Sequence, residues 1–337
     1  MTMDYGGRRV LVTGADGFIG SHLVERLAAL GASVTALSLY NSFDRFGWLD
    51  DLAPEIWDGI RVVRGDVRDA AFVRGLVEGH EIVFHLAALI AIPFSYEAPG
   101  SYVDVNVTGT LNVLEAARIN GVARVVHTST SEVYGTARYE PIDEDHPLQG
   151  QSPYSASKIG ADMMAEAYAR SFGLPVVILR PFNTYGPRQS ERAVIPAAIR
   201  QALDPGCAEI RLGDLAPRRD FCFVADTADA FARLGLAKAP DYGRPYNAGT
   251  GRAVGIGEMV EVVRRLTGCG KPVVGDPDRF RPEGSEVRTL LADSDRLRQA
   301  TGWTPGHDLE AGLARTVDWW RQRLAAGQVR RGAGYMT

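Results

Sequence analysis

Features that mark a secreted or membrane-bound chain are scarce in this sequence. It has three cysteines among 337 residues, Cys207, Cys222 and Cys269, and no two of them form a CxxC pair. Thiols spaced in this way predict neither a disulfide framework nor a metal site. The longest apolar run, 82–94, is interrupted by His85 and falls well short of the ~20 residues that cross a bilayer. The amino-terminus lacks the order of a signal peptide, so we expect a cytoplasmic protein without a membrane partner.

An excess of charge of one sign is also missing. The chain has 37 Lys and Arg against 41 Asp and Glu, which gives a formal net charge of −4 at pH 7. Such a balance offers no electrostatic footprint for nucleic acid, so we expect no nucleic-acid partner. An anionic substrate must then be held by a few local arginines or lysines. The rest of the composition, 45% hydrophobic and 23% charged, is typical of a globular chain, here long enough for about two domains.

Short β-branched runs alternate with segments of helical periodicity along the first half of the chain. They predict strands at 9–13, 33–37, 60–63, 82–86, 124–128 and 175–179, and helices at 19–30, 70–78, 106–120 and 155–172. This alternation predicts an α/β fold, a Rossmann-like doubly wound parallel sheet covered on both faces. Beyond residue 180 the regularity decays. We therefore expect a first domain at 1–180 and, at 181–337, a smaller irregular α/β lobe, some of whose segments return to the main sheet and which ends in a brace helix at 309–324.

A glycine-rich loop joins the first strand to the first helix. Gly14, Gly17 and Gly20 stand where the backbone must turn tightly, approach a pyrophosphate and pack helix on strand. The helix N-terminus, which includes Phe18 and Ile19, offers N–H groups and the positive end of its dipole to phosphates. This strand–loop–helix context predicts a dinucleotide-binding domain.

The end of the second strand normally decides which dinucleotide binds, through an acid about 20 residues beyond the glycines. Ser38 stands at that place, and no acid lies within the strand. Ser38 and Arg45 could accept the 2′-phosphate of NADP; alternatively, Ser38 bonds a ribose hydroxyl of NAD and Arg45 is solvated. We favour NADP slightly. After the third strand, Asp66 and Val67 are expected at the adenine, whereas Asp69 fits the N-cap of the helix at 70–78.

Two groups of residues carry the chemistry. Tyr154 and Lys158 are four apart in a helix, so phenol and ammonium lie on one face, and the ammonium favours the phenolate that can take a proton. Thr130, Ser131 and Glu132 follow a strand, at the sheet edge where ligands bind. Thr130 can share a substrate hydroxyl with Tyr154, and Glu132 would lie one step further along the same sugar.

The motifs together make the chain recognisable. They are the glycine loop, Phe84-His-Leu-Ala-Ala88, Asn106 with Gly109-Thr110, Tyr154 with Lys158, Arg180-Pro-Phe-Asn183 with Tyr185-Gly-Pro187, and Arg219-Asp-Phe221. In this order they resemble the extended short-chain dehydrogenase/reductase family, the NAD(P)-dependent nucleotide-sugar epimerases and dehydratases. The resemblance implies that Ala87, Ala88 and Asn106 contact the cofactor.

The same resemblance implies a homodimer. The helices at 106–120 and 155–172 would pair with a second copy in a four-helix contact through Val113, Leu114, Met163 and Met164. The alternative is that these side chains pack on the sheet of their own chain.

Substrate contacts are expected from a small set of side chains. Arg219 and Arg281 are predicted on the diphosphate, because a planar guanidinium matches phosphate oxygens well. Asn183 is a further amide contact to the same group, and Ser95 and Arg188 are weaker candidates.

The segment 129–135 resembles GDP-mannose 4,6-dehydratases and bacterial NDP-N-acetylglucosamine 4,6-dehydratases. The stretches 89–95 and 146–152 are most similar to the latter, of the legionaminic or bacillosamine type. The resemblance thus implies a 4,6-dehydratase, with UDP-N-acetylglucosamine as the best guess for its substrate and Tyr154, Lys158, Thr130 and Glu132 as catalytic residues. Ser131 stands where dTDP-glucose 4,6-dehydratases have Asp, which leaves the C6 general acid open. A 4-epimerase is the alternative, and a non-catalytic dinucleotide sensor is a distant one.

Overall fold

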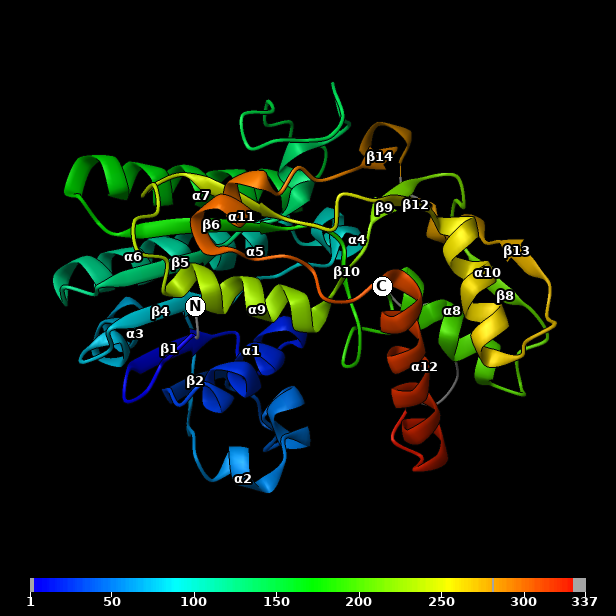
Figure 1. The fold of residues 1–337 in the computed structure, drawn as a ribbon, viewed down its shortest axis with the longest axis horizontal. Helices are drawn as coiled ribbons and strands as arrows, with labels where there is room; N and C mark the ends of the chain where they lie inside the picture. The colour runs from blue at the N-terminus through cyan, green and yellow to red at the C-terminus, as the bar shows by residue number, and fades with distance from the viewer. Residues whose placement is uncertain (1–2, 281, 330–337) are drawn as a thin grey trace.

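The computed structural model describes residues 3–280 and 282–329. Seven parallel strands form the main sheet, in the order β11-β6-β5-β4-β1-β2-β3 (Figure 1). They are β1 (Arg9–Thr13), β2 (Ser33–Leu39), β3 (Arg61–Gly65), β4 (Ile82–His85), β5 (Arg124–Thr128), β6 (Val176–Pro181) and β11 (Pro245–Ala248). The strand order reverses between β1 and β4, the switch point at which such sheets bind ligands. The predicted doubly wound α/β fold is confirmed, and β1 and β5 have the predicted bounds.

Helices cover both faces of this sheet. One face carries α1 (Phe18–Ala29), α9 (Val224–Gly235) and α11 (Asp295–Thr301), and the other carries α3 (Ala70–Val77), α6 (Gly109–Ile119) and α7 (Pro153–Phe172). Side chains of a strand alternate between the two faces. Accordingly Val10 and Val12 belong to the first core, whereas Leu11 belongs to the second. Asp69 caps α3 as predicted, because its carboxylate accepts a hydrogen bond from the Phe72 N–H.

Two elements of the second half of the chain belong to the main sheet. Strand β11 pairs with β6 at the sheet edge, and α9 packs against α1. Phe231 of α9 is fully buried in the core that α1 also fills. Later segments therefore lie in and on the main sheet. The division into two domains, with its boundary at residue 180, stays a prediction.

The smaller lobe lies beside the carboxyl ends of the strands (Figure 1). It contains α8 (Val194–Leu203), α10 (Ile256–Thr267), α12 (Leu309–Ala325), β7 (Thr184–Tyr185), β8 (Ile210–Leu212), β9 (Arg218–Asp220), β10 (Cys222–Phe223), β12 (Ala253–Gly255), β13 (Val273–Gly275) and β14 (Thr289–Leu290). Its strands form three small sheets, β10-β7, β12-β9-β14 and β13-β8. Its core is a separate apolar cluster that includes Ile199, Met259 and Trp320.

The C-terminal helix α12 joins the lobe to the first half of the chain. Trp320 is buried in the lobe core, and the Trp319 ring packs edge-on against Trp48, with ring centroids 5.7 Å apart. Arg323 forms an ion pair with Asp51. These contacts agree with the expected brace.

Short elements complete the described chain. They are the α-helices α2 (Pro54–Trp57), α4 (Ile92–Glu97) and α5 (Pro99–Tyr102), the 3₁₀ helices η1 (Gly47–Asp51), η3 (Ser131–Tyr134), η4 (Pro277–Arg279) and η5 (Glu283–Ser285), and the π-helical segment η2 (Val103–Thr108). The helix predicted at 106–120 is therefore two elements, because its first turn belongs to the π-helical segment η2 and α6 begins only at Gly109. No helix in the described part of the chain is long and apolar enough to cross a membrane.

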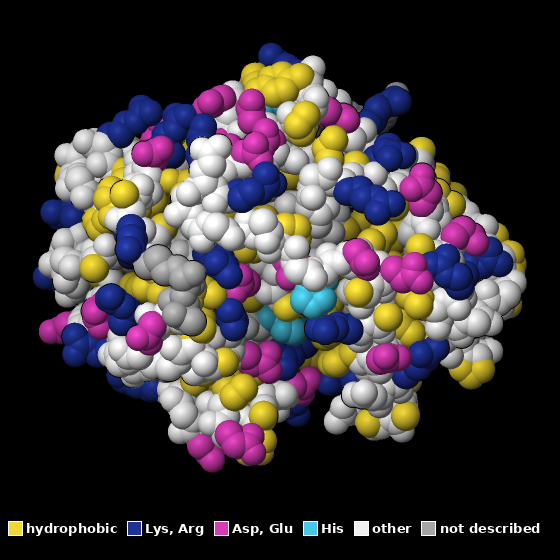
Figure 2. All heavy atoms as spheres, in the orientation of Figure 1, with side chains coloured by type: hydrophobic (Ala, Val, Ile, Leu, Met, Phe, Trp, Pro, Cys, Tyr) yellow, Lys and Arg dark blue, Asp and Glu magenta, His cyan; other side chains and the backbone are white. Residues whose placement is uncertain are grey.

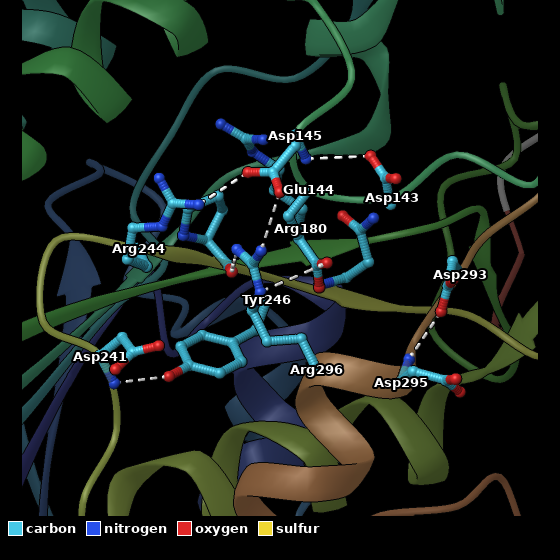
Figure 3. A network of polar contacts seen from close by, with 12 residues as sticks. Asp143, Glu144, Asp145, Arg180, Asp241, Arg244, Tyr246, Asp293, Asp295 and Arg296 are labelled. Carbon is cyan, nitrogen blue, oxygen red and sulfur yellow. Dashed lines mark hydrogen bonds and ion pairs between the residues drawn. The ribbon is translucent and has the colours of Figure 1, made fainter. Parts of the chain in front are cut away.

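The open edge of β11 is covered by the loop before α7. Glu144 accepts a hydrogen bond from the Asn247 N–H, and the Asn247 side chain donates to the Ile142 carbonyl. Arg296 of α11 reaches toward the carboxylates of Glu144 and Asp145, as Figure 3 shows. An edge strand with paired N–H groups no longer offers a template for another chain. On the face shown in Figure 2, basic and acidic side chains are interspersed, so neither sign gathers there.

Candidate active site

A cavity of about 940 Å³ opens at the carboxyl ends of the parallel strands. Its wall comes from the glycine loop after β1, the ends of β2 and β3, and the segments after β4, β5 and β6. The predicted residues that line it are Gly14, Gly17, Phe18, Ile19, Gly20, Asp66, Val67, Ala87, Ala88, Thr130, Ser131, Glu132, Tyr154, Lys158, Asn183 and Arg188. A volume of this size accommodates a large organic ligand.

The glycine loop has the shape that a dinucleotide requires. Gly14 has a φ of +65°, and a Cβ atom on it would lie 2.7 Å from the Ala87 backbone nitrogen. A Cβ atom on Gly20 would lie 2.0 Å from the Gly14 carbonyl oxygen, so only glycine lets α1 pack this close to the loop. No side chain caps the N-terminus of α1, and its first turn holds no acid. These residues therefore fit the pyrophosphate of a dinucleotide.

Two further atoms on the cavity wall point to a ligand. Asn183 Oδ1 and Thr128 Oγ1 are buried and have no hydrogen-bond partner among the described residues. Buried polar atoms without partners are uncommon in folded proteins. No group of three or more His, Cys, Asp or Glu in the described chain is placed to hold a metal ion.

Tyr154 stands in the first turn of α7, at the cavity wall. The helix starts at this point because Ser152 and Ser155 form a reciprocal capping box and Pro153 occupies the first turn. Thr130, which follows β5, hydrogen-bonds to the Tyr154 phenol. Its hydroxyl also accepts from the Glu132 N–H at 3.2 Å, which fixes the turn that carries Glu132. The structure therefore brings Thr130, Glu132 and Tyr154 together as the sequence predicts.

Burial controls the protonation of the catalytic pair. Burial raises the pKa of Tyr154 above its ordinary value, the Thr130 hydrogen bond opposes this, and the charge of Glu132 adds to it. Burial lowers the pKa of Lys158 to about 8, although the negative charge of Asp162 opposes this shift. The Lys158 ammonium donates to the Thr128 carbonyl oxygen at 2.6 Å. In the chain alone Tyr154 thus stays a phenol at neutral pH, which is the form that can donate a proton.

A buried polar network lies behind Lys158. Asp162 Oδ2 accepts hydrogen bonds from the Ser129 hydroxyl at 2.7 Å and from two Arg180 nitrogens at 3.1 and 3.0 Å. The His127 ring lies 3.2 Å from Asp162 Oδ1. Although burial raises the pKa of Asp162, Arg180 and His127 lower it to about 2. A carboxylate held in its charged form therefore faces the ammonium of Lys158.

Two predicted ligand contacts instead hold the protein together. Asn106 is fully buried, and its amide bonds both the N–H and the C=O of Leu89 and the Ser157 hydroxyl. It therefore fixes the loop after β4 against α7, and its contact with the cofactor stays a prediction. Ser95 is buried and donates to the Ile92 carbonyl, so its hydroxyl is already engaged and its substrate contact stays a prediction.

The predicted substrate arginines are engaged with carboxylates. Arg188 lines the cavity, but its guanidinium forms a two-pronged pair with Glu25 at 2.9 and 2.8 Å, so the structure does not present it as a free phosphate contact. Arg219 does not line the cavity and donates to Glu286 Oε1 at 3.0 Å. Arg281 lies outside the described residues.

The end of β2 also differs from the expectation. Ser38 is fully buried and donates to Asp16 Oδ2 at 3.1 Å, so its hydroxyl does not face a ribose. Arg45 pairs with Asp50 and does not line the cavity. Asp66 lines the cavity, but Arg68 donates hydrogen bonds to both of its carboxylate oxygens, and this lowers the pKa of Asp66.

Sequence reasoning missed two site residues. Asp16 lies inside the glycine loop, where only the glycines drew attention. Asp162 continues the four-residue spacing of Tyr154 and Lys158 along one face of α7, and that spacing is a signal that could have revealed it.

A doubly wound sheet, a glycine cradle at its switch point and a paired tyrosine and lysine define an enzyme of the dinucleotide-dependent short-chain dehydrogenase/reductase type. Residues 11–316 match the family model described as GDP-mannose 4,6 dehydratase, and the chain belongs to that family. It is thus a sugar-nucleotide enzyme of the dehydratase and epimerase kind.

Some relatives that match nearly the whole chain are 4-epimerases, and others are 4,6-dehydratases. A UDP-glucose 4-epimerase of Mycolicibacterium smegmatis is 36% identical over 94% of this chain and 99% of the relative. A dTDP-glucose 4,6-dehydratase of an Actinoplanes species is 35% identical over 93% of this chain and 98% of the relative. A solved structure of a double mutant of the Streptomyces venezuelae dTDP-glucose 4,6-dehydratase, with NAD bound, matches with a TM-score of 0.84. That match has 32% identity and covers 94% of this chain and 98% of the other.

Proposed function

We propose that the chain is a nucleotide-sugar 4,6-dehydratase, which converts an NDP-hexose into its 4-keto-6-deoxy derivative. The observation that carries this proposal is the position of Glu132. Its carboxylate lines the same cavity as Tyr154 and lies near enough for its charge to raise the pKa of the phenol. A 4-epimerase needs the tyrosine, the lysine and the threonine, but it has no task for a carboxylate beside them.

Each side chain then has a role in the reaction. The nicotinamide dinucleotide, when bound, supplies reversible hydride transfer. Tyr154 acts as the phenolate, the form that the charges of Lys158 and of the bound nicotinamide ring would favour, and it removes the proton of the C4 hydroxyl as C4 is oxidised. The resulting ketone makes the C5 proton acidic, and Glu132 removes it while the C6 hydroxyl leaves as water. Tyr154 and Lys158 keep the C4 oxygen in place until C6 has been reduced.

Glu132 also has the proton that the leaving hydroxyl needs. Ser131 is buried beside it and has an ordinary hydroxyl in place of a carboxylic acid. We therefore assign both the C5 base and the C6 acid to Glu132.

The substrate that we propose is UDP-N-acetylglucosamine or another NDP-N-acetylglucosamine. The cavity wall near Tyr154 is apolar where Leu89, Ile90 and Phe94 line it, and an acetamido methyl group would bury apolar surface there. Asn183, with an unpartnered buried oxygen, supports a polar contact to the nucleotide part. Arg219 would bind the diphosphate by exchanging Glu286 for phosphate oxygens, since its fork already holds one anion.

Glu132→Gln tests the assignment because it keeps the size of the side chain but removes the base. We expect formation of the 4-keto-6-deoxy product to fall roughly 10²–10⁴-fold, the loss typical of a missing general base. Oxidation at C4 survives, so absorbance of reduced nicotinamide should build up when substrate is added.

Tyr154→Phe is the matched control. It blocks the first step, so neither product nor reduced nicotinamide should appear. Dehydration by Glu132→Gln at the wild-type rate would refute the role of Glu132.

A 4-epimerase is the second candidate, and the similarity to the mycobacterial UDP-glucose 4-epimerase supports it. The two functions differ in the mass of the product. Incubation with UDP-, GDP-, CDP- and dTDP-sugars followed by mass spectrometry should give a product that has lost water if the chain is a dehydratase. A stereoisomer of unchanged mass would establish the epimerase instead.

A further inference from the structure

The glycine loop places an acidic residue at the end of the second strand, which has no acidic residue of its own. Strand β2 contains no Asp or Glu. Asp16, however, lies against the strand end, where its Oδ2 accepts hydrogen bonds from the Leu39 N–H at 3.0 Å and the Ser38 hydroxyl at 3.1 Å. The bonds to β2 use only Oδ2. Asp16 also lines the cavity, together with Leu39 and Gly65.

This place has a defined meaning in a doubly wound sheet. The adenosine ribose of a bound dinucleotide lies beyond the carboxyl end of the second strand, where a carboxylate receives the 2′-hydroxyl of NAD. Asp16 offers such a carboxylate from a different element. The Asp16 carbonyl also accepts from the Trp48 N–H at 3.0 Å, so the loop that carries it is held from a second side.

Three arginines near this end of the sheet are already paired with carboxylates. Arg45 pairs with Asp50, and Arg64 pairs with Asp44. Arg68, which lines the cavity, pairs with Asp66. A 2′-phosphate placed there would meet the carboxylate of Asp16, and each of these arginines would have to leave a carboxylate to reach it.

We propose that Asp16 selects NAD and rejects NADP, because its carboxylate accepts the 2′-hydroxyl of the adenosine ribose and repels a 2′-phosphate. The inference rests on the proposed dinucleotide site and reverses the slight preference for NADP. That preference assumed that no acid lies at the end of β2. Asp16 is 22 residues before Ser38 in the sequence, and only the fold brings the two together.

The test compares retention of the two dinucleotides. Wild type, Asp16→Asn and Asp16→Ala are equilibrated with equal excesses of NAD and NADP, freed of unbound cofactor by gel filtration and denatured. The released dinucleotides are then quantified by chromatography. We expect wild type to retain NAD at least about 10-fold over NADP, and both variants to lower this ratio by about 10-fold or more, since a like charge is removed.

Glu55→Gln is the matched control. It removes one negative charge from α2, which lies between β2 and β3 in the chain, but Glu55 is exposed, does not line the cavity and is not the partner of Arg45, Arg64 or Arg68. It should leave the ratio unchanged. A ratio that does not move in either Asp16 variant, or that moves equally in Glu55→Gln, would overturn the inference and leave the proposed function intact. A wild-type chain that retains neither dinucleotide would overturn the proposed function, and the inference with it.

Discussion

Lys158 shows how a single residue exchanges stability for function. Its ammonium is fully buried. Besides the charge of Asp162 on its own helix, it has the Thr128 backbone carbonyl as its hydrogen-bond partner. Because burial lowers its pKa from 10.5 to about 8, the folded chain binds its proton less tightly than the unfolded chain does. Keeping the buried Lys158 amine protonated therefore costs free energy of folding below pH 8, and this cost disappears as the pH rises toward 10.5.

Lys158→Met should therefore abolish activity without destabilising the chain. At pH 7 the variant is expected to gain up to about 3 kcal/mol in free energy of unfolding, at 1.36 kcal/mol for each pKa unit. The gain shrinks between pH 8 and pH 10, where wild type recovers its own cost. Denaturant unfolding of cofactor-free protein at a series of pH values measures this difference. A difference that is constant with pH would contradict the assigned cause.

At this same scale the sequence predicts some site residues well and others poorly. Tyr154 and Lys158 were predictable because one helix face sets their distance, and Thr130 and Glu132 because they follow a strand end. The roles of Ser38, Asn106, Arg188 and Arg219 were not predictable in the same way. Their partners are Asp16, Leu89, Glu25 and Glu286, and only the three-dimensional fold shows which carboxylate or backbone group meets each side chain.

Among the elements, α7 positions most of the catalytic apparatus. Tyr154, Lys158 and Asp162 follow one another along one face, and Asp162 connects the helix to β6 through Arg180. The π-helical segment η2 lies against α7 and presents Asn106 to Ser157. The strands and long helices were predictable from periodicity, but a local i→i+5 widening leaves no such signal, so η2 was not.

The Asp162–Arg180 pair gives a prediction for α7 as an element. Asp162→Leu leaves the Arg180 charge buried without its carboxylate and should cost about 3–5 kcal/mol of stability. Adding Arg180→Met to this variant should recover most of the loss, because the buried charge is removed as well. Thermal or denaturant unfolding of the single and double variants measures the recovery.

Activity provides the second readout of this experiment. In the double variant Lys158 has lost the carboxylate that faces it, so kcat should stay low although the chain is stable again. A double variant with wild-type kcat would show that Asp162 serves only the packing of α7 on the sheet.

At the scale of the whole molecule, the sheet and the lobe are interwoven. Strand β11 and helix α9 come from the second half of the chain but complete the sheet and one of its cores. The sequence predicted that some segments return, but not which ones, because β11 is only four residues long and its pairing with β6 depends on contacts remote in sequence. The cavity has walls from both halves of the chain because residues that follow β6, such as Asn183 and Arg188, also line it.

The homodimer is the prediction that concerns the whole molecule. The structure limits which of the predicted residues are available for the contact between the two copies. Val113 and Leu114 are buried in the core of their own chain, so they are not available to a second copy. Met163 of α7 and Val103 of η2 are 42% and 52% exposed, and the two elements lie against each other. An apolar surface on these elements would be covered in a four-helix contact.

Met163→Glu should therefore convert a dimer into a monomer, since a charge placed in an apolar contact must be desolvated without a partner. Light scattering coupled to gel filtration at micromolar concentration measures the mass of both proteins. Phe43→Glu is the control, because Phe43 is 82% exposed in the loop after β2, away from α7 and η2, and should leave the mass of a dimer unchanged. Wild type that elutes as a monomer would refute the dimer. A dimer that persists in Met163→Glu would place the contact elsewhere than on α7, and the exposed side chains of this helix would then need another explanation.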